Sequence, residues 1–168
     1  MSLAITIHLQ QQQLFVSDQC TDTLIACYPI STAKKGAGEQ RGSYQTPRGQ
    51  HYIRAKIGAH LPRAAVLVGR RWTGEVCDDA LFAAQPERDW ILSRILWLCG
   101  REVGKNRLGE VDTMARYIYI HGTPDAVSLS TPQSHGCIRM HNDDVIALFE
   151  QVSCFTPVQI VEGNVSCG

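Results

Sequence analysis

The segment QSHGCIRMHNDD, residues 133–144, places one cysteine, Cys137, between two histidines. A thiol in this setting could act as a nucleophile, ligate a metal, or pack as a small apolar side chain. Metal binding requires several Cys or His ligands at clustered spacings. The chain has no Cys-x-x-Cys and no His-x-x-x-His, although His121, His135 and His141 could converge. We therefore expect no metal and no cofactor.

The surroundings of Cys137 set it apart from the other cysteines. A buried inert thiol is the usual state of a free cysteine. Gly136 and Pro132 before Cys137, with a capped helix after it, instead predict an irregular turn beside a helix N-terminus. Such a position exposes the sulfur and lowers the pKa of the thiol. The cysteines expected to be buried and inert are Cys20, Cys27, Cys77, Cys99, Cys154 and Cys167.

A nucleophilic cysteine also needs a base, and His121 is the candidate. It ends the strand-like run RYIYIH, residues 116–121, and Gly122 follows it. His121 and Cys137 are sixteen residues apart, a distance of roughly 50 Å in an extended chain. The segment between them, residues 122–136, is rich in Gly, Pro, Ser and Thr and can fold back as a loop. A structural histidine at a strand end is the alternative.

The elements that must position these residues are mostly strands. Runs of β-branched and aromatic residues between Gly, Pro and Asp clusters predict a mainly antiparallel β-domain. One helix is expected over residues 141–153, with Asn142 as N-cap and one apolar face. Residues 81–90 predict a second short helix or an irregular loop. The expected strands cover residues 4–9, 13–17, 23–31, 49–57, 90–98, 116–121 and 157–163.

Length and charge restrict the class of protein. The 168 residues, 44% of them hydrophobic, suit one domain over residues 1–168. Sixteen basic and sixteen acidic residues leave no net charge to attract nucleic acid or an anionic membrane. No run approaches the roughly 18 apolar residues of a membrane helix, and the first residues lack the pattern of an export signal. Seven cysteines, an odd number, fit a reducing compartment, so we expect a cytoplasmic protein with a small-molecule partner.

Two motifs resemble the signature of the YkuD-like family, the L,D-transpeptidase catalytic domains. The first is HGT at residues 121–123, followed after a loop by SHGC at residues 134–137 and by Arg139. The second covers residues 30–53, where a stretch of small residues leads to Thr-Pro-x-Gly at residues 46–49 and then to a strand. The resemblance extends from the first expected hairpin to the last expected strand.

The resemblance implies a mainly β, sandwich-like fold with one or two short helices and a cysteine acyl-transfer enzyme that acts on peptidoglycan stem peptides. The family cleaves the bond between meso-diaminopimelate and D-Ala and holds the shortened stem as a thioester. Cys137 would be the nucleophile and His121 the base, with the carbonyl of Gly122 orienting His121. The backbone N–H groups of Gly136 and Cys137 would form the oxyanion hole.

Ser134, His135 and Arg139 would contribute to the substrate site. A turn-forming hydroxyl is the alternative for Ser134. The guanidinium of Arg139 could bind a carboxylate of the stem peptide, or it could form a salt bridge with Asp143 or Asp144. Some family members carry Asn at the position of Arg139. Arg94 and Arg116 raise the same two possibilities, and the side-chain alternatives to the Gly122 carbonyl are Asp112 and Asp125.

The acceptor that resolves the thioester determines the product. An amine of a second stem gives a cross-link, whereas water gives L,D-carboxypeptidase activity. In the cytoplasm the accessible substrate is a soluble muropeptide tetrapeptide returning for murein recycling, or a nucleotide-linked precursor, and water is the abundant acceptor. We therefore expect an L,D-carboxypeptidase. The alternatives are a transpeptidase that forms cross-links or exchanges D-amino acids, and a non-catalytic module that binds stem peptides or uses the same residues for zinc or redox chemistry.

Overall fold

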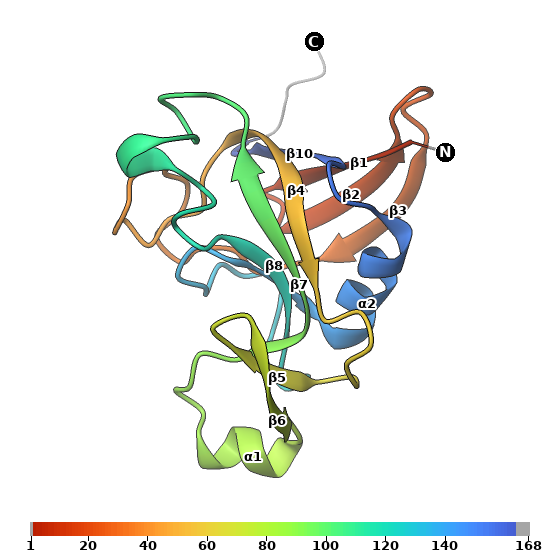
Figure 1. Ribbon diagram of the computed structural model, residues 1–168, viewed down its shortest axis with the longest axis vertical. Coiled ribbons are helices and arrows are strands. Elements are labelled where there is room, and N and C mark those ends of the chain that lie inside the picture. Colours follow the sequence, from red (N-terminus) through yellow and green to blue (C-terminus); the bar gives the residue numbers. More distant parts are fainter. Residues whose placement is uncertain (1, 164–168) are drawn as a thin grey trace.

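A curled sheet forms the framework of the molecule in the computed structural model, which describes residues 2–163 (Figure 1). Its strands are β1 (Leu3–His8), β2 (Gln13–Asp18), β3 (Leu24–Pro29), β4 (Gly49–Ile57), β5 (Ala65–Val68), β6 (Arg71–Val76), β7 (Ile91–Gly100), β8 (Tyr119–Thr123), β9 (Ile138–His141) and β10 (Pro157–Val161). The order is β3-β2-β1-β10-β4-β7-β5-β6, and β8 pairs with both β7 and β9. Pairs β1–β10 and β8–β9 are parallel, and the others are antiparallel. The expected mainly β fold is confirmed.

The strands at the N-terminal end show the alternation of a half-buried sheet. In β1 the side chains of Ile5 and Ile7 are buried, and in β2 those of Leu14 and Val16 are buried, while the residues between them are more exposed. The closing strand β10 then lies beside β1. One face of this part of the sheet therefore forms half of the core.

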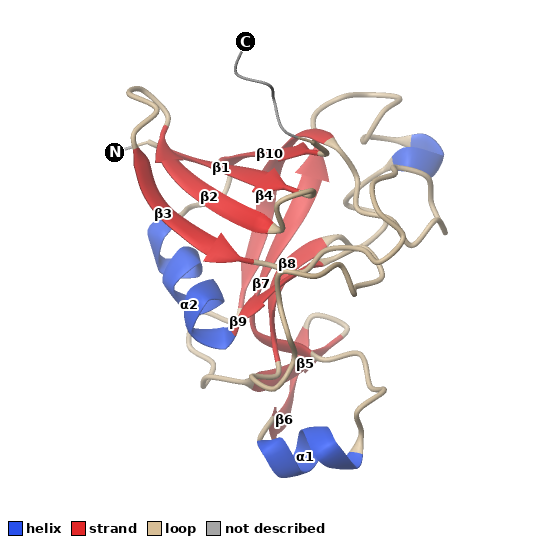
Figure 2. Ribbon diagram, turned by 180° about the vertical axis from the view of Figure 1, so that it is seen from behind, coloured by secondary structure: helices blue, strands red, loops and turns tan. Residues whose placement is uncertain are grey.

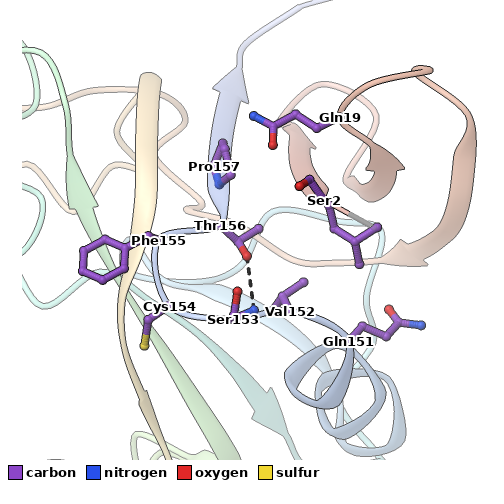
Figure 3. Close-up of a pocket in the computed structure, with 10 residues that line it drawn as sticks. Ser2, Gln19, Gln151, Val152, Ser153, Cys154, Phe155, Thr156 and Pro157 are labelled. Atoms are coloured by element: carbon purple, nitrogen blue, oxygen red, sulfur yellow. Dashed lines mark hydrogen bonds between the residues drawn. The ribbon is translucent and has the colours of Figure 1, made fainter.

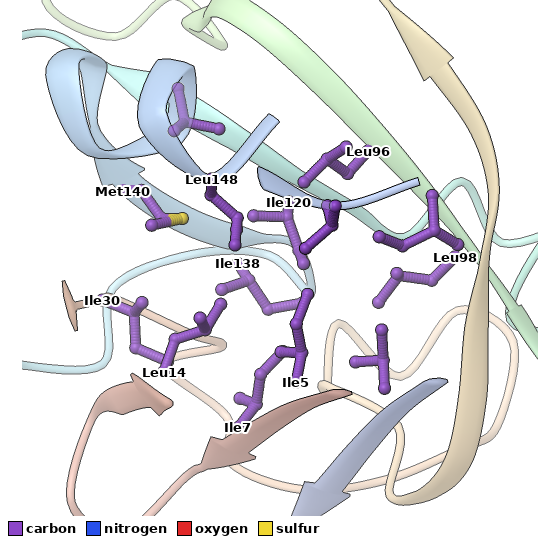
Figure 4. Close-up of a cluster of buried hydrophobic side chains, with 14 of the residues drawn as sticks. Ile5, Ile7, Leu14, Ile30, Leu96, Leu98, Ile120, Ile138, Met140 and Leu148 are labelled. Atoms are coloured by element: carbon purple, nitrogen blue, oxygen red, sulfur yellow. The ribbon is translucent and has the colours of Figure 1, made fainter. Parts of the chain in front are cut away.

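The other half of the core comes from β7, β8, β9 and helix α2 (Asn142–Gln151), which packs against these three strands. Figure 4 shows Ile5, Ile7 and Leu14 of the first half opposite Ile120 and Ile138 of β8 and β9. Because β8 and β9 each bury alternate side chains in this core, their remaining side chains must point to the opposite face. That face carries the candidate site.

Strands β5 and β6 and helix α1 (Asp79–Ala84) extend from one end of the molecule (Figure 2). They have a small apolar cluster of their own, which includes Val66 and Trp90. Asp78 caps α1 by accepting a hydrogen bond from the N–H of Leu81 at 2.7 Å. The helix ends before Pro86, so the segment 81–90 is part helix and part loop.

Several boundaries differ from those expected. Strand β8 begins at Tyr119 and continues to Thr123, so His121 lies inside the strand and not at its end. The start is delayed because Tyr117 adopts a left-handed conformation, φ 57°, and the N–H of Arg116 closes a turn onto Asp112. Strands β5, β6 and β9 were not expected: β5 has only four residues, and β6 and β9 mix apolar with charged or polar residues.

Asn142 is the first residue of α2 and not its N-cap, which is His141. The side chain of Asn142 is buried and makes other hydrogen bonds. Its Nδ2 donates to the carbonyl of Thr123 at 3.0 Å, and its Oδ1 accepts from the hydroxyl of Ser93 at 2.6 Å. The side chain thus ties the start of α2 to the ends of β7 and β8, and it is not available for capping.

Candidate active site

The parallel pair β8–β9 brings His121 and Cys137 to one face of the sheet. Its register places His121 beside Arg139, and side chains two residues apart share a face. Tyr119, His121, Cys137 and Arg139 therefore lie together. His121 is buried and Cys137 is half-buried. Both line a pocket of about 170 Å³, so the loop between them does fold back.

The backbone of the next residue orients His121. Its Nδ1 lies 2.7 Å from the carbonyl oxygen of Gly122. Because a carbonyl oxygen can only accept, Nδ1 carries the proton and Nε2 keeps its lone pair. A Cβ atom on Gly122 would lie 2.6 Å from both Leu92 O and Asn142 Oδ1. Glycine is therefore the residue that fits at this position.

Two backbone groups hold the thiol of Cys137. The N–H of Tyr119 donates to Sγ at 3.3 Å, and the thiol donates to the carbonyl of Tyr117 at 3.4 Å. The thiol is thus fixed by the segment that leads into β8. In this arrangement the S–H bond of the thiol points to the Tyr117 carbonyl oxygen.

Burial dominates the protonation of both groups. It raises the pKa of Cys137 to about 12, although the Tyr119 N–H and Arg139 oppose the shift. It lowers the pKa of His121 to about 4, against the effect of the Gly122 carbonyl. Both shifts favour the uncharged forms, a neutral thiol and a neutral imidazole. The lowered thiol pKa expected from a helix N-terminus is wrong, because strand β9 separates Cys137 from α2 and its sulfur is desolvated.

The turn that carries the cysteine is fixed by its own serine. Ser134 is buried; its hydroxyl donates to the carbonyl of Cys137 at 2.6 Å and accepts from the N–H of Gly136 at 3.2 Å. Gly136 has a φ of 136°, which a side chain would strain. Ser134 thus has the turn-forming role that was its alternative. The N–H of Gly136, one of the two expected oxyanion donors, already has an acceptor within the protein.

The upstream motif packs against this turn. The buried hydroxyl of Thr46 donates to the carbonyl of Gly136 at 2.9 Å and accepts from the N–H of Ala33 at 3.1 Å. Backbone hydrogen bonds also join Ser31 to Arg139 in both directions. Thr46 therefore positions the cysteine turn. The sequence motif contained this residue, although its role was not inferred from the sequence.

Charged groups surround the pocket. Arg139 lines it together with Cys137, and Asp89 lies at the same pocket. Burial lowers the pKa of Arg139, while the charges of Asp89 and Cys137 raise it. Asp143 pairs with Arg63 at 2.7 Å, and in residues 2–163 no salt bridge joins Arg139 to Asp143 or to its neighbour in α2. Asp89 was missed, because it belongs to no motif and only folding brings it to the pocket.

His135 is exposed and makes an edge contact with Tyr44, with 5.8 Å between ring centroids. It borders the pocket of Cys137 and a neighbouring hollow of about 360 Å³. Lys34 and Lys35 line that hollow. His135 is therefore placed to contact a ligand that extends beyond the thiol.

Four residues left open by the sequence make structural contacts. Arg116 lines the pocket but donates to three backbone carbonyls. Arg94 is buried and donates to two. Asp112 accepts from two backbone N–H groups in its own turn. Asp125 pairs with Arg63 at 2.9 Å. Neither aspartate bonds to His121, whose Nδ1 is satisfied by Gly122.

Another cysteine offers a contrast. Cys154 lies at a hollow of about 230 Å³ near the N-terminus (Figure 3). No histidine and no carboxylate is among the residues that line it, so this thiol has no base. The expectation that the other cysteines are buried is only partly right: Cys99 is buried, Cys77 is half-buried, Cys20, Cys27 and Cys154 are exposed, and Cys167 lies outside the described residues.

Residues 2–163 contain no group of three or more His, Cys, Asp or Glu side chains arranged to hold a metal ion. His121, His135 and Cys137 meet at one pocket, but the Nδ1 atom of His121 is bonded to a carbonyl. Within the same range, no helix is both long enough and apolar enough to cross a membrane.

Comparison with known proteins shows which family the chain resembles. Residues 2–160 match the family model described as YkuD, L,D-transpeptidase catalytic domain. A stretch of 52 residues is 44% identical to YqjB of Bacillus subtilis (strain 168), which is named as a candidate L,D-transpeptidase. That stretch covers 31% of this chain and 30% of YqjB.

Solved structures share the fold. An L,D-transpeptidase from Mycobacterium smegmatis matches with a TM-score of 0.55 and 18% identity, over 95% of this chain and 58% of that one. L,D-transpeptidase 3 from Mycobacterium tuberculosis matches with a TM-score of 0.58 and 18% identity, over 96% of this chain and 61% of that one. The chain thus spans about six-tenths of the length of these two structures.

Proposed function

Because this chain belongs to the YkuD family of L,D-transpeptidase catalytic domains, we propose that it is a cysteine acyl-transfer enzyme acting on peptidoglycan stem peptides. The observation that carries the proposal is the common pocket of Cys137 and His121, with Nδ1 of the histidine bonded to Gly122. A thiol, a base and a group that orients the base are the parts that nucleophilic acyl transfer requires. The catalytic unit is a single domain over residues 1–168.

In the first half-reaction, the sulfur of Cys137 attacks the carbonyl carbon of the L-centre of meso-diaminopimelate. Nε2 of His121 takes the thiol proton and then gives it to the nitrogen of D-Ala as the C–N bond breaks, which leaves a thioester. Attack and proton transfer occur together, because a separated thiolate and imidazolium are disfavoured in a pocket that raises one pKa and lowers the other.

The developing oxyanion needs hydrogen-bond donors, and the N–H of Cys137 is the first that we assign. The N–H of Gly136 can join it only by leaving the hydroxyl of Ser134. Arg139 faces the pocket and has no competing salt bridge among residues 2–163, so we assign to it a carboxylate of the stem. His135 contacts the substrate further from the thiol.

Water resolves the thioester in the reaction that we favour. His121 takes a proton from the water, the C–S bond breaks, and the thiol recovers the proton. Cross-linking requires the amine of a second stem near the thioester, and free muropeptides lack the tethering that raises its effective concentration in the wall. The proposed activity is therefore that of an L,D-carboxypeptidase of murein recycling in the cytoplasm, which converts tetrapeptide to tripeptide and D-Ala.

The test is incubation with a disaccharide tetrapeptide that ends in D-Ala, followed by mass spectrometry. We expect tripeptide and free D-Ala as the main products, and no turnover by Cys137→Ser. Cys154→Ser, which alters an exposed thiol without a base, should keep full activity. A cross-linked dimer as the main product would identify a transpeptidase.

Faropenem tests the nucleophile without a substrate, because one structure of the M. tuberculosis enzyme carries a faropenem-derived adduct. We expect one covalent adduct per chain, located on Cys137. A protein that binds stem peptide but neither turns it over nor forms the adduct would be a non-catalytic binding module.

A further inference from the structure

The backbone that holds the thiol is unusual. The carbonyl of Tyr117 accepts a hydrogen bond from the thiol, and the N–H of Tyr119 donates one to the sulfur, so both contacts come from one three-residue segment. Tyr117 has a φ of 57°, a conformation that a tyrosine adopts only when its surroundings enforce it. Its side chain is 52% exposed, so burial in the core does not enforce it. Its N–H closes a turn onto the carbonyl of Met114 at 3.0 Å, and a side-chain contact adds to this hold on the segment.

Arg70 makes that contact. Its Nη1 donates to the hydroxyl of Tyr119 at 3.1 Å. Its guanidinium carbon lies 5.0 Å from the ring centroid of Tyr117 and 5.0 Å from that of Trp97. The ring of Trp97 in turn contacts both tyrosines, with centroid distances of 5.9 and 5.6 Å. One cation therefore joins the side chains of the two residues whose backbone groups hold the nucleophile.

The position of Arg70 is itself fixed. It lies in the tight turn between β5 and β6, where Val68 pairs with Arg71. Leu67, which precedes Val68 in β5, is buried in a cluster that also contains Tyr119. The hairpin thus presents Arg70 to the rings of Trp97, Tyr117 and Tyr119, which we call the aromatic wall. Of these residues, Tyr117 also lines the pocket. The neighbouring Arg71 is exposed, and its side chain makes no hydrogen bond or ion pair within residues 2–163.

We propose that Arg70 is a positioning residue for Cys137, acting through Tyr117 and Tyr119 to hold the two backbone groups that contact the thiol. The inference rests on the proposed role of Cys137 as the nucleophile. Arg70 contacts Tyr117, which lines the pocket, but does not itself line it, and its cation–π contacts lie at the surface, where they contribute little to stability. Its loss should therefore change reactivity more than folding.

The experiment compares Arg70→Ala, Arg70→Lys and the matched control Arg71→Ala. We expect Arg70→Ala to lower kcat by about tenfold, because displacement of a reacting group by roughly 1 Å can cost up to about 10² in rate. KM should stay within about twofold, since no contact with the substrate is lost. Arg70→Lys should restore part of kcat, and all three variants should unfold at nearly the same temperature as the unaltered protein.

Alkylation by iodoacetamide gives a second measurement that needs no substrate. Loosening the wall admits water to a sulfur whose pKa is raised mainly by burial, so Cys137 should react about threefold faster or more in Arg70→Ala. Cys154 serves as the internal reference and should react at an unchanged rate. Tyr119→Phe should show part of the effect and add little when combined with Arg70→Ala, because both changes remove the same hydrogen bond.

An unchanged kcat and alkylation rate in Arg70→Ala would overturn the inference, as would an effect on KM alone or an equal loss in Arg71→Ala. Failure of the proposed function can be distinguished from failure of this inference about Arg70. If the unaltered protein releases no D-Ala, the alkylation rates of Cys137 and Cys154 still decide whether Arg70 controls the thiol.

Discussion

The chemistry of single residues depends here on desolvation more than on charge. Cys137 and His121 meet at one pocket, and burial is the largest cause of both of their pKa shifts. Asp89 raises the pKa of both groups, whereas Arg139 lowers both. The effects of Asp89 and Arg139 on each pKa thus partly cancel, and desolvation favours the neutral form of both groups. Under the proposed function, Cys137 would form its thiolate only as it attacks.

The pH dependence of alkylation tests the neutral pair. We expect the reaction of iodoacetamide with Cys137 to rise with pH through pH 9 without a plateau, because the pKa of the thiol is raised to about 12. Mass spectrometry of the alkylated peptide after timed quenching gives the rate. A plateau with a midpoint near neutral pH, removed by His121→Gln, would instead establish a preformed thiolate–imidazolium pair.

At the scale of elements, the site depends on how β8 fits between β7 and α2. Gly122 lies where the carbonyl of Leu92 in β7 and the side chain of Asn142 in α2 approach β8. The same residue supplies the carbonyl that orients His121. Packing and the orientation of His121 therefore depend on one backbone position, and a side chain there would disturb both.

Gly122→Ala should accordingly reduce both stability and activity. The new Cβ would lie 2.6 Å from two atoms, one of them a backbone carbonyl, and overpacking of this kind costs about 1–3 kcal/mol. The shift of β8 should also lower kcat by displacing the acceptor of Nδ1. Urea unfolding and D-Ala release measure the two effects.

Gly163→Ala is the control for that variant, because its Cβ would meet its nearest neighbour at an ordinary 3.5 Å and its φ is not positive. It should change neither measurement. If Gly122→Ala were as stable and as active as the unaltered protein, β8 would tolerate movement that the packing described above excludes.

For the molecule as a whole, buried histidines tie stability to pH. His51 lies between the Gly49 carbonyl at 3.0 Å and the Thr113 hydroxyl at 2.9 Å, and burial lowers its pKa to about 4, as it does for His121. The unfolded chain binds these protons near a pKa of about 6.5, so between these values the unfolded state holds more protons than the folded state. The contribution of these two histidines to the free energy of unfolding is fully present above that range, and it is lost as pH falls through it.

Urea unfolding between pH 7.5 and pH 4.5 measures this loss. Each histidine should contribute a slope of about 1.4 kcal/mol per pH unit within the window. His121→Gln should remove one such contribution and so give a shallower slope than the unaltered protein. An equal slope in the variant and in the unaltered protein would show that His121 does not titrate as its burial requires.

Part of this architecture could be predicted from the sequence, because it is encoded locally. Alternation of apolar residues predicted the hairpin of β1 and β2, and helical periodicity predicted α2. The residue types and spacing around Cys137 and His121 indicated a nucleophile and a base. These signals depend on neighbours in the chain, which a single sequence contains.

Only the tertiary structure decided the environment of those residues. Strand β9 is too short and too polar to be predicted from the sequence. Its pairing with β8 nevertheless brings Cys137 to His121 and away from the start of α2. The raised pKa of the thiol, the arrival of Asp89 at the pocket and the contact of Arg70 with the aromatic wall all arise between segments distant in the chain. Desolvation and long-range electrostatics depend on everything that surrounds a group in space, and no local pattern of residues specifies that.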